Sequence, residues 1–223
     1  MKNIIFILAF TLSFAGKAQE AVEKTIGEFT TVKVYDLIHL KMIKSDENKI
    51  VVTGKNREDI EVLNKNGKLK IRMNFSESFN GNSTVVELYY TSVDVIDANE
   101  GSKVVVSNLI EQYEIDLKTQ EGAEITAELK TTYANFRAVS GGIINVTGNS
   151  KNQDISIYTG GVFNGEEFIT EQTEVSINAA GEAYVNATEN VEVSIKAGGD
   201  VFIYGNPKHV DESRVLGGRI KRM

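Results

Sequence analysis

A repeat of about twenty residues constrains the fold of this chain more than any other sequence feature. Its three clearest copies each read apolar, Ser, Ile, variable, small, small, Gly, and they lie at 155–161, 175–181 and 193–199. The last glycines of successive turns fall at 101, 122, 142, 161, 181, 199 and 218, which gives steps of 21, 20, 19, 20, 18 and 19 residues. A period sustained in this way predicts a repeat architecture in which each copy forms one structural unit.

Apolar residues alternate within each copy, as at Ile155 and Ile157 before the turn and at Val201 and Ile203 after it. Because alternation is typical of half-buried strands, each copy is predicted to form a strand, a glycine turn and a second strand. One such unit cannot bury its apolar face alone, whereas coils stacked edge to edge share a continuous core. The sequence therefore predicts an all-β fold, a single-stranded parallel β-solenoid (β-helix) with coils of about 20 residues and an N-terminal β-strand cap.

The 19 glycines and the single proline fit this prediction. Glycine adopts positive φ without a Cβ penalty, and the small residues Thr159, Ala179 and Ala197 are predicted to turn inward at the corners. Proline cannot donate a ladder hydrogen bond, so strands that pair on both sides exclude it.

Residues 19–92 lack the repeat but contain alternating segments, and Asn66-Gly67 is a favoured hairpin turn. A short helix is predicted over 57–63. Because a first coil would expose unpaired edge groups, we expect this region to cap the solenoid as well as extend it. The strands of the region are predicted at 31–35, 38–43, 50–52, 68–73 and 85–90.

The C-terminal end carries its own protection, since Arg219, Lys221 and Arg222 place charge on the last edge. No flexible linker interrupts the sequence. We therefore expect residues 19–223 to form one unit, with a core at about 28–220 and clear repeats over 93–223.

The first residues read as an export signal. Lys2 is followed by an apolar run at 4–15 and by small residues before Gln19. The 12 residues of this run are too few to span a membrane, which takes about 20 in a helix. We predict a signal peptide at 1–18 and no transmembrane segment after its cleavage, with the mature chain in the periplasm, at the cell surface or outside the cell.

Composition excludes several kinds of chemistry. The absence of Cys removes disulfides, thiolate ligands and thiol nucleophiles, and His39 and His209 stand alone. The formal net charge of −7 becomes −9 without Lys2 and Lys17, and the scattered basic residues argue against a nucleic-acid partner. Neighbouring carboxylates in the sequence point apart on a strand, and no outward register is expected to cluster Asp, Lys or Arg. We predict no catalytic residue, cofactor or metal site.

One outward register carries a candidate binding ladder. Ser156, Ser176 and Ser194 recur at the same position of successive copies and could contact a regular polymer or the surface of another chain. The alternative is that serine is simply tolerated at solvated positions.

A second outward register contains Asn145, Asn164, Tyr184 and Phe202. Aromatic rings one strand spacing apart could stack on sugar rings, so Tyr184 and Phe202 are also candidate ligand-binding residues. The alternative is that a loop or the N-terminal region packs over them.

Several segments resemble the putative auto-transporter adhesin head GIN domain family. Segments 197–207 (AGGDVFIYGNP) and 217–220 (GGRI) are similar to its closing motif, and 29–34, 50–54 and 66–71 are similar to its opening strands. The resemblance covers roughly 28–220 and implies an exported bacterial β-solenoid, often from Bacteroidetes-like organisms, without an assigned ligand. The family more often has Gly-Ser-Gly where this chain has Leu216-Gly217-Gly218, which concerns only the last turn. The resemblance supplies no catalytic residue.

These observations predict a non-enzymatic, exported cell-envelope interaction module, adhesin-like, whose partner is an envelope or surface glycan or protein. An alternative is a polysaccharide-binding or polysaccharide-processing β-helix, a lyase or hydrolase whose acid–base pair comes from different coils. A third is a structural envelope protein that self-assembles, and an oligomer is compatible with each of the three.

Overall fold

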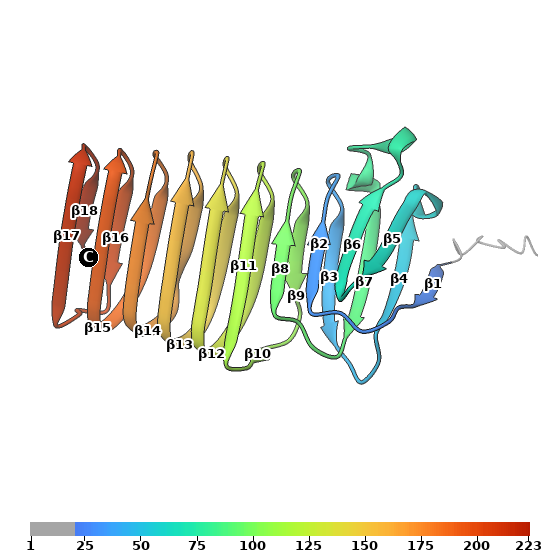
Figure 1. The fold of residues 1–223 in the computed structure, drawn as a ribbon, viewed down its shortest axis with the longest axis horizontal. Helices are drawn as coiled ribbons and strands as arrows, with labels where there is room; N and C mark the ends of the chain where they lie inside the picture. Colours follow the sequence, from blue (N-terminus) through green and yellow to red (C-terminus); the bar gives the residue numbers. More distant parts are fainter. Residues whose placement is uncertain (1–20) are drawn as a thin grey trace, which may run out of the picture.

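The computed structural model describes residues 21–223, so the predicted signal peptide at 1–18 lies outside the described residues. Within these residues, eighteen strands form one continuous hydrogen-bonded sheet. It winds into a rod of about seven turns with about 19 residues per turn (Figure 1), and the predicted parallel β-solenoid is confirmed. Between residues 21 and 223 there is no helix long and apolar enough to cross a membrane.

Parallel strands in register build the regular part of the rod. We call the side formed by β8, β11, β17 and the second halves of β12 to β15 the front face, which is nearest the viewer in Figure 1. The back face is formed by β9, β16, β18 and the first halves of β12 to β15. These strands are β8 (Val95–Ala98), β9 (Lys103–Val106), β10 (Ile110–Glu111), β11 (Glu114–Gln120), β12 (Glu124–Val139), β13 (Ile143–Tyr158), β14 (Val162–Ile177), β15 (Glu182–Ala197), β16 (Asp200–Tyr204), β17 (His209–Leu216) and β18 (Arg219–Arg222).

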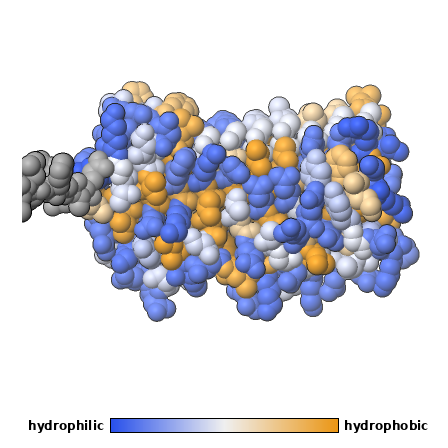
Figure 2. Space-filling view, turned by 180° about the vertical axis from the view of Figure 1, so that it is seen from behind, coloured by the Kyte–Doolittle hydropathy of each residue, from blue (hydrophilic) through white to orange (hydrophobic). Residues whose placement is uncertain are grey.

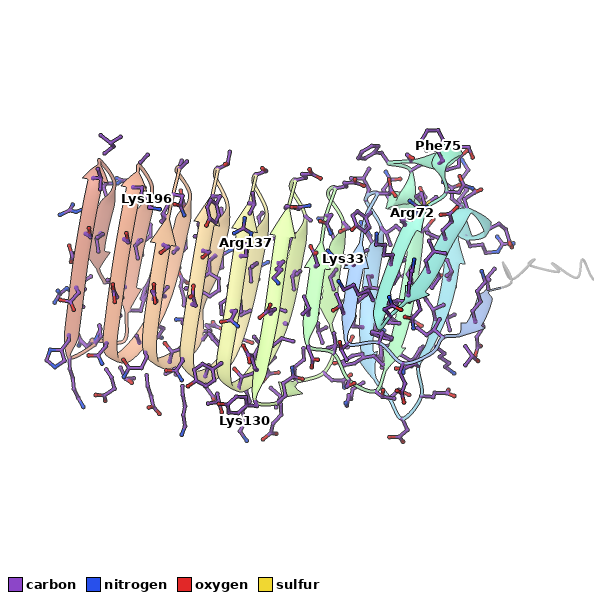
Figure 3. All side chains as sticks on the ribbon, in the orientation of Figure 1. Lys33, Arg72, Phe75, Lys130, Arg137 and Lys196 are labelled. Atoms are coloured by element: carbon purple, nitrogen blue, oxygen red, sulfur yellow. The ribbon has the colours of Figure 1, made fainter. Side chains whose placement is uncertain are left out.

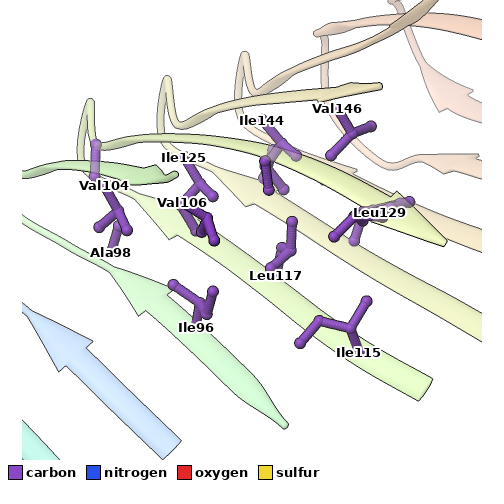
Figure 4. Close-up of a cluster of buried hydrophobic side chains, with 14 of the residues drawn as sticks. Ile96, Ala98, Val104, Val106, Ile115, Leu117, Ile125, Leu129, Ile144 and Val146 are labelled. Atoms are coloured by element: carbon purple, nitrogen blue, oxygen red, sulfur yellow. The ribbon is translucent and has the colours of Figure 1, made fainter. Parts of the chain in front are cut away.

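Inward side chains from the two faces form a core that runs along the rod. Figure 4 shows part of it, with Ile96 and Leu117 of the front face near Ile125 of the back face. Rings fill the middle coils, where the centroids of Phe136 and Phe163 lie 4.8 Å apart. Buried and outward residues alternate along these strands, as the period of two predicts.

Glycines serve two separate purposes in the turn at 140–142. Ser140 and Gly141 have φ of 49° and 74°, so both central residues of this turn adopt the left-handed conformation. The next glycine, Gly142, is needed because a Cβ there would lie 2.6 Å from Thr119 Oγ1 and 2.7 Å from its backbone. One glycine therefore permits the turn, and the other permits close stacking of coils.

The corner residues differ from the prediction in one respect. Thr159 and Ala179 are exposed and Ala197 is half-buried, so the expectation that they point inward is wrong. Thr159 itself has a φ of 49° and is part of the turn, which directs its side chain to solvent. The strand register also places Ala123 beside Gly142. The glycine predicted for the earlier coil, Gly122, therefore lies one residue before the position that is aligned with Gly142.

The N-terminal region extends and caps the rod, as predicted, but its coils do not follow chain order. Strand β2 pairs with β8 on one side and with β6 on the other, and β3 pairs likewise with β9 and β7. The first coil in the sequence therefore lies between the second and the third. The elements are β1 (Val22–Thr25), β2 (Thr31–Val34), β3 (His39–Lys44), β4 (Lys49–Gly54), η1 (Arg57–Asp59), β5 (Ile60–Lys65), β6 (Lys68–Met73), η2 (Phe75–Glu77), η3 (Gly81–Ser83) and β7 (Thr84–Tyr90).

Antiparallel strands close this end: β5 pairs with β6, β4 with β7, and β1 with β4. The predicted helix over 57–63 is wrong, because η1 covers only three residues and the rest belongs to β5. Asn66 and Gly67, with φ of 52° and 73°, form the predicted hairpin turn and pair Ile60 with Met73. The hairpin pairing thus overrides any local helical preference.

Charged residues end the core at the other side. In the last coil Glu212 and Arg214 occupy the inward positions held by Val193 and Ile195 in the coil before. Glu212 lies 3.9 Å from Arg214 Nη2 and 4.0 Å from Arg222 Nη2. Inward charges of this kind discourage edge-to-edge pairing of sheets.

Candidate interaction surface

Outward side chains of the front face repeat from coil to coil. The register places Ser156, Ser176 and Ser194 side by side, with Ser213 next in the row. Neighbouring strands lie about 4.8 Å apart, so these hydroxyls form a ladder along the rod, in which the first three serines are half-buried and Ser213 is exposed. Their role in binding stays a prediction.

A ladder of carboxylates runs beside the serines. The register aligns Asp154, Glu174, Glu192 and Asp211, each two residues before a serine of the ladder. We call these four residues the acidic ladder. The expectation that no outward register clusters Asp, Lys or Arg is therefore wrong. The signal was present in the repeat, where an acidic residue stands two positions before each serine.

The acidic ladder borders an open hollow of about 530 Å³. A second ladder lines the same hollow and consists of the amides Asn152, Gln172 and Asn190, which are neighbours in the register of successive coils. Asn190 Nδ2 donates a hydrogen bond to Gln172 Oε1 at 2.7 Å. The hollow thus offers carboxylates along one row and amides along the next.

The acidic ladder places four carboxylates on adjacent strands, where each carboxylate disfavours ionisation of its neighbours. Partial burial, and then the carboxylates of Asp154 and Glu192, raise the pKa of Glu174 above its usual value. Burial also raises the pKa of Asp154. None of the ion pairs formed within residues 21–223 involves the four carboxylates of the ladder. A row of uncompensated charge attracts partners with positive groups.

The back face carries the aromatic candidates. Tyr184 and Phe202 are neighbours in register, and their rings stack with centroids 4.7 Å apart and planes 11° apart. One flat face of each ring is therefore covered by the other ring. The same row continues as an amide ladder in which Asn164 Nδ2 donates to Asn145 Oδ1 at 2.7 Å.

The N-terminal region does not cover these rings. Strands β1 to β7 lie at the opposite end of the rod from β15 and β16 (Figure 1), so these strands are not the cover that the alternative expects. Tyr184 and Phe202 are half-exposed, and Tyr184 Oη donates to Glu182 Oε2 at 2.9 Å. Figure 2 shows the back face as a mosaic of hydrophilic and hydrophobic residues.

The residues described contain no group of three or more His, Cys, Asp and Glu side chains placed to hold a metal ion. In the acidic ladder the carboxylates stand one per strand along a parallel sheet and point the same way, so they do not converge on a point. The surface therefore consists of aligned rows with no central pocket.

Solved structures share this fold. A putative adhesin from Bacteroides fragilis has a TM-score of 0.84 at 16% identity, covering 92% of this chain and 96% of that chain. A putative adhesin from Parabacteroides distasonis has a TM-score of 0.73 at 17% identity, with coverage of 92% and 96%. A putative lipid binding protein from the same species has a TM-score of 0.68 at 15% identity, with the same coverage. At these identities the likeness shows the fold alone.

No curated protein matches the chain. A family model does match, over residues 28–207, and this span runs from the strands of the cap to the end of β16. It stops before β17, where the inward positions change from apolar to charged. Since the match takes in most of both regions of the rod, the chain belongs to the family described as "Putative auto-transporter adhesin, head GIN domain".

Proposed function

We propose that this protein is a non-enzymatic, exported interaction module of the cell envelope that binds a surface glycan or protein. The observation that carries the proposal is the alignment of the serine ladder with the acidic ladder across adjacent coils of one flat face. The predicted signal peptide at 1–18 supports export. The names of the related structures, which include putative adhesins, support a role in surface contact.

The ladders provide a physical mechanism for such contact. Each rung offers a hydroxyl and a carboxylate at a spacing of about 4.8 Å, and the strands hold these groups in place before a partner arrives. A partner with basic or hydroxyl groups repeated along its length would contact several rungs at once. Negative charge along the row would also raise the rate of encounter with a positively charged partner.

A binding assay with charge-altered ladders tests the proposal. The purified mature chain and the double variant Glu174→Gln/Glu192→Gln would be applied to a glycan array and to whole cells. The matched control is Tyr184→Ala/Phe202→Ala, which removes the aromatic pair from the back face. We expect the front-face variant to lose binding and the control to retain it. Binding that survives both double variants would contradict a role for either row, and intact chain found in the cytoplasm would contradict export.

One observation favours a second function, the processing of a polysaccharide. The raised pKa of Glu174 is a property of general acids, and the carboxylates of Asp154 and Glu192 stand on the neighbouring coils. Incubation with a panel of polysaccharides, followed by size analysis of the products, tests this alternative. Cleavage by the parent chain and its loss in Glu174→Gln would establish it in place of the binding role.

A further inference from the structure

The segment between β6 and β7, residues 74–83, leaves the rod and exposes two aromatic side chains. Phe75 is 97% exposed and Phe79 is 60% exposed. Figures 1 and 3 show the segment projecting beyond the row of turns, with Phe75 at its outer limit. Apolar rings held in water gain nothing from the core, so stability of the fold does not explain them.

Hydrogen bonds hold this segment in one conformation. Asp36 is buried, and its carboxylate accepts hydrogen bonds from the backbone N–H groups of Met73 and Phe79, each at 3.0 Å. The carbonyl of Asp36 accepts a further bond from the N–H of Gly81 at 3.0 Å. Asn56 Nδ2 also donates to the carbonyl of Asn80 at 2.9 Å. The exposed rings are therefore presented by a preorganised support.

The same place stores backbone strain. Phe79 has a φ of 60°, in the left-handed region, and it lies outside the coil turns where residues such as Ser140 and Thr159 regularly adopt this conformation. Such a conformation costs about 1–3 kcal/mol in a bulky non-glycine residue. The N–H of Phe79 is one of the two donors to the Asp36 carboxylate, which helps to hold this conformation.

A hollow of about 350 Å³ lies beneath the segment, within the range of about 300–1,000 Å³ typical of small-molecule sites. Arg72 binds Glu61 through Nε and Nη2, at 2.9 and 2.7 Å. None of the ion pairs formed within residues 21–223 involves Lys70. The hollow is lined in part by Tyr35, Lys70, Arg72, Phe75, Phe79 and Glu100.

We propose that this hollow binds a terminal sugar ring of a glycan. The rings of Phe75 and Phe79 would contact the apolar C–H face of the sugar, as aromatic faces do with flat apolar surfaces. Arg72 and Lys70 donate hydrogen bonds and Glu100 accepts them, which suits hydroxyl groups that do both. A carboxylate on the sugar would be met by the same two cations.

The size and chemistry of the site favour a sugar over a protein partner. Stable protein interfaces bury about 1,200–2,000 Å² in total, whereas the apolar surface here is limited to two rings set among charged side chains. The site lies at the capped end of the rod, away from the acidic ladder of β13 to β17 (Figure 1). It therefore does not depend on binding by the ladders.

A glycan array with the mature chain and Phe75→Ala tests the inference. The matched control is Val215→Ala, whose side chain is 71% exposed at the other end of the rod. We expect Phe75→Ala to weaken binding to at least one glycan by about tenfold, as loss of a central aromatic contact does, and Val215→Ala to leave it unchanged. Because Phe75 makes little contact with the fold, both variants should melt at the temperature of the parent chain. An array on which no glycan depends on Phe75, or Phe75-dependent binding to proteins alone, would overturn the inference.

A titration of the mature chain with methyl glucoside and with methyl glucuronide tests whether the preferred sugar is neutral or acidic. The amide NMR signals of Phe79 and Arg72 are followed in both titrations. A neutral ligand predicts shifts with both probes that Arg72→Gln weakens equally. An acidic ligand predicts that Arg72→Gln weakens the glucuronide more, while Lys68→Gln, on the same strand but not lining the hollow, changes neither. Absence of shifts with both probes, together with an array lacking Phe75-dependent glycans, refutes the site.

Discussion

The regular coils at 93–223 and the cap at 21–92 use the same strand pairing but differ in order and in charge. Each regular coil lies on the one before it in sequence, whereas in the cap the coil of β2 and β3 lies between two later coils. Both regions carry 11 Lys and Arg residues, but the cap has 10 Asp and Glu residues and the coils have 20. The excess negative charge therefore belongs to the regular part.

This difference shows how order along the chain determines the kind of surface that results. In the coils each residue lies beside its equivalent, so one side chain is repeated as a row, as in the acidic ladder. In the cap, out-of-order pairing brings together residues with no sequence relation, such as Asp36, Phe79 and Glu100. Rows suit extended partners, whereas a single hollow suits one small group.

If the coils depend on strict alternation, Ile177→Asp should have the largest effect on stability. Ile177 is fully buried between Ile157 and Ile195, and a charge there has no partner. We expect the free energy of unfolding to fall by about 4 kcal/mol, measured by chemical denaturation. Ser176→Asp, which faces outward, should cost less than about 0.5 kcal/mol. Equal losses for the two variants would contradict the register.

The two purposes of glycine in the coils predict unequal costs for Gly142→Ala and Gly141→Ala. A Cβ on Gly142 would meet Thr119 at 2.6–2.7 Å, so we expect a loss of about 3 kcal/mol. No atom lies within 4 Å of a Cβ on Gly141, and only its φ of 74° opposes alanine, at a cost of about 1 kcal/mol. Thermal melting separates the two. Equal melting temperatures would mean that the coil shifts to accept a methyl group.

Sequence patterns predicted the coils better than the cap for a physical reason. Alternation and glycine turns are local, and a repeat that stacks on itself leaves one choice of neighbour for each strand. Apolar and polar residues also alternate in the segments at 31–35 and 68–73, but this local pattern does not indicate that β2 lies between β6 and β8. The residues around the hollow of the cap, among them Asp36, Phe79 and Glu100, meet only because of that order. The acidic ladder, in contrast, could have been found by aligning the repeats.

The cap should respond locally to Asp36→Asn. An amide oxygen can replace only part of the carboxylate that accepts from Met73 and Phe79, so one backbone N–H is left without its partner. We expect a loss of about 1.5 kcal/mol. Hydrogen exchange should quicken at the amides of Met73 and Phe79, while the amide of Ile177 in the coils is unaffected. Exchange that quickens equally in both regions would show that the cap and the coils unfold as one unit.

The smallest effect is expected in the acidic ladder, from Glu174→Gln. Partial burial and the carboxylates of Asp154 and Glu192 raise the pKa of Glu174 in the folded chain, so the folded state binds this proton more readily than the unfolded state does. By linkage, Glu174 opposes folding above its folded-state pKa, and the opposition fades as the pH falls toward the unfolded value of about 4.3. We therefore expect Glu174→Gln to be more stable than the parent chain at pH near neutral, by less than about 0.5 kcal/mol because the group is exposed, and equally stable in acid.

Denaturation of the Glu174→Gln variant and the parent chain at the two pH values measures this difference, with Glu171→Gln as the control because Glu171 is exposed on β14 outside the ladder. Lower stability of Glu174→Gln at neutral pH would show that the carboxylate accepts a stabilising contact instead. The dependence of stability on salt concentration distinguishes the two causes of the raised pKa of Glu174. The repulsion from Asp154 and Glu192 is screened as ionic strength rises, whereas the cost of burial is not, so the stability gained in high salt measures how far the coils charge one another.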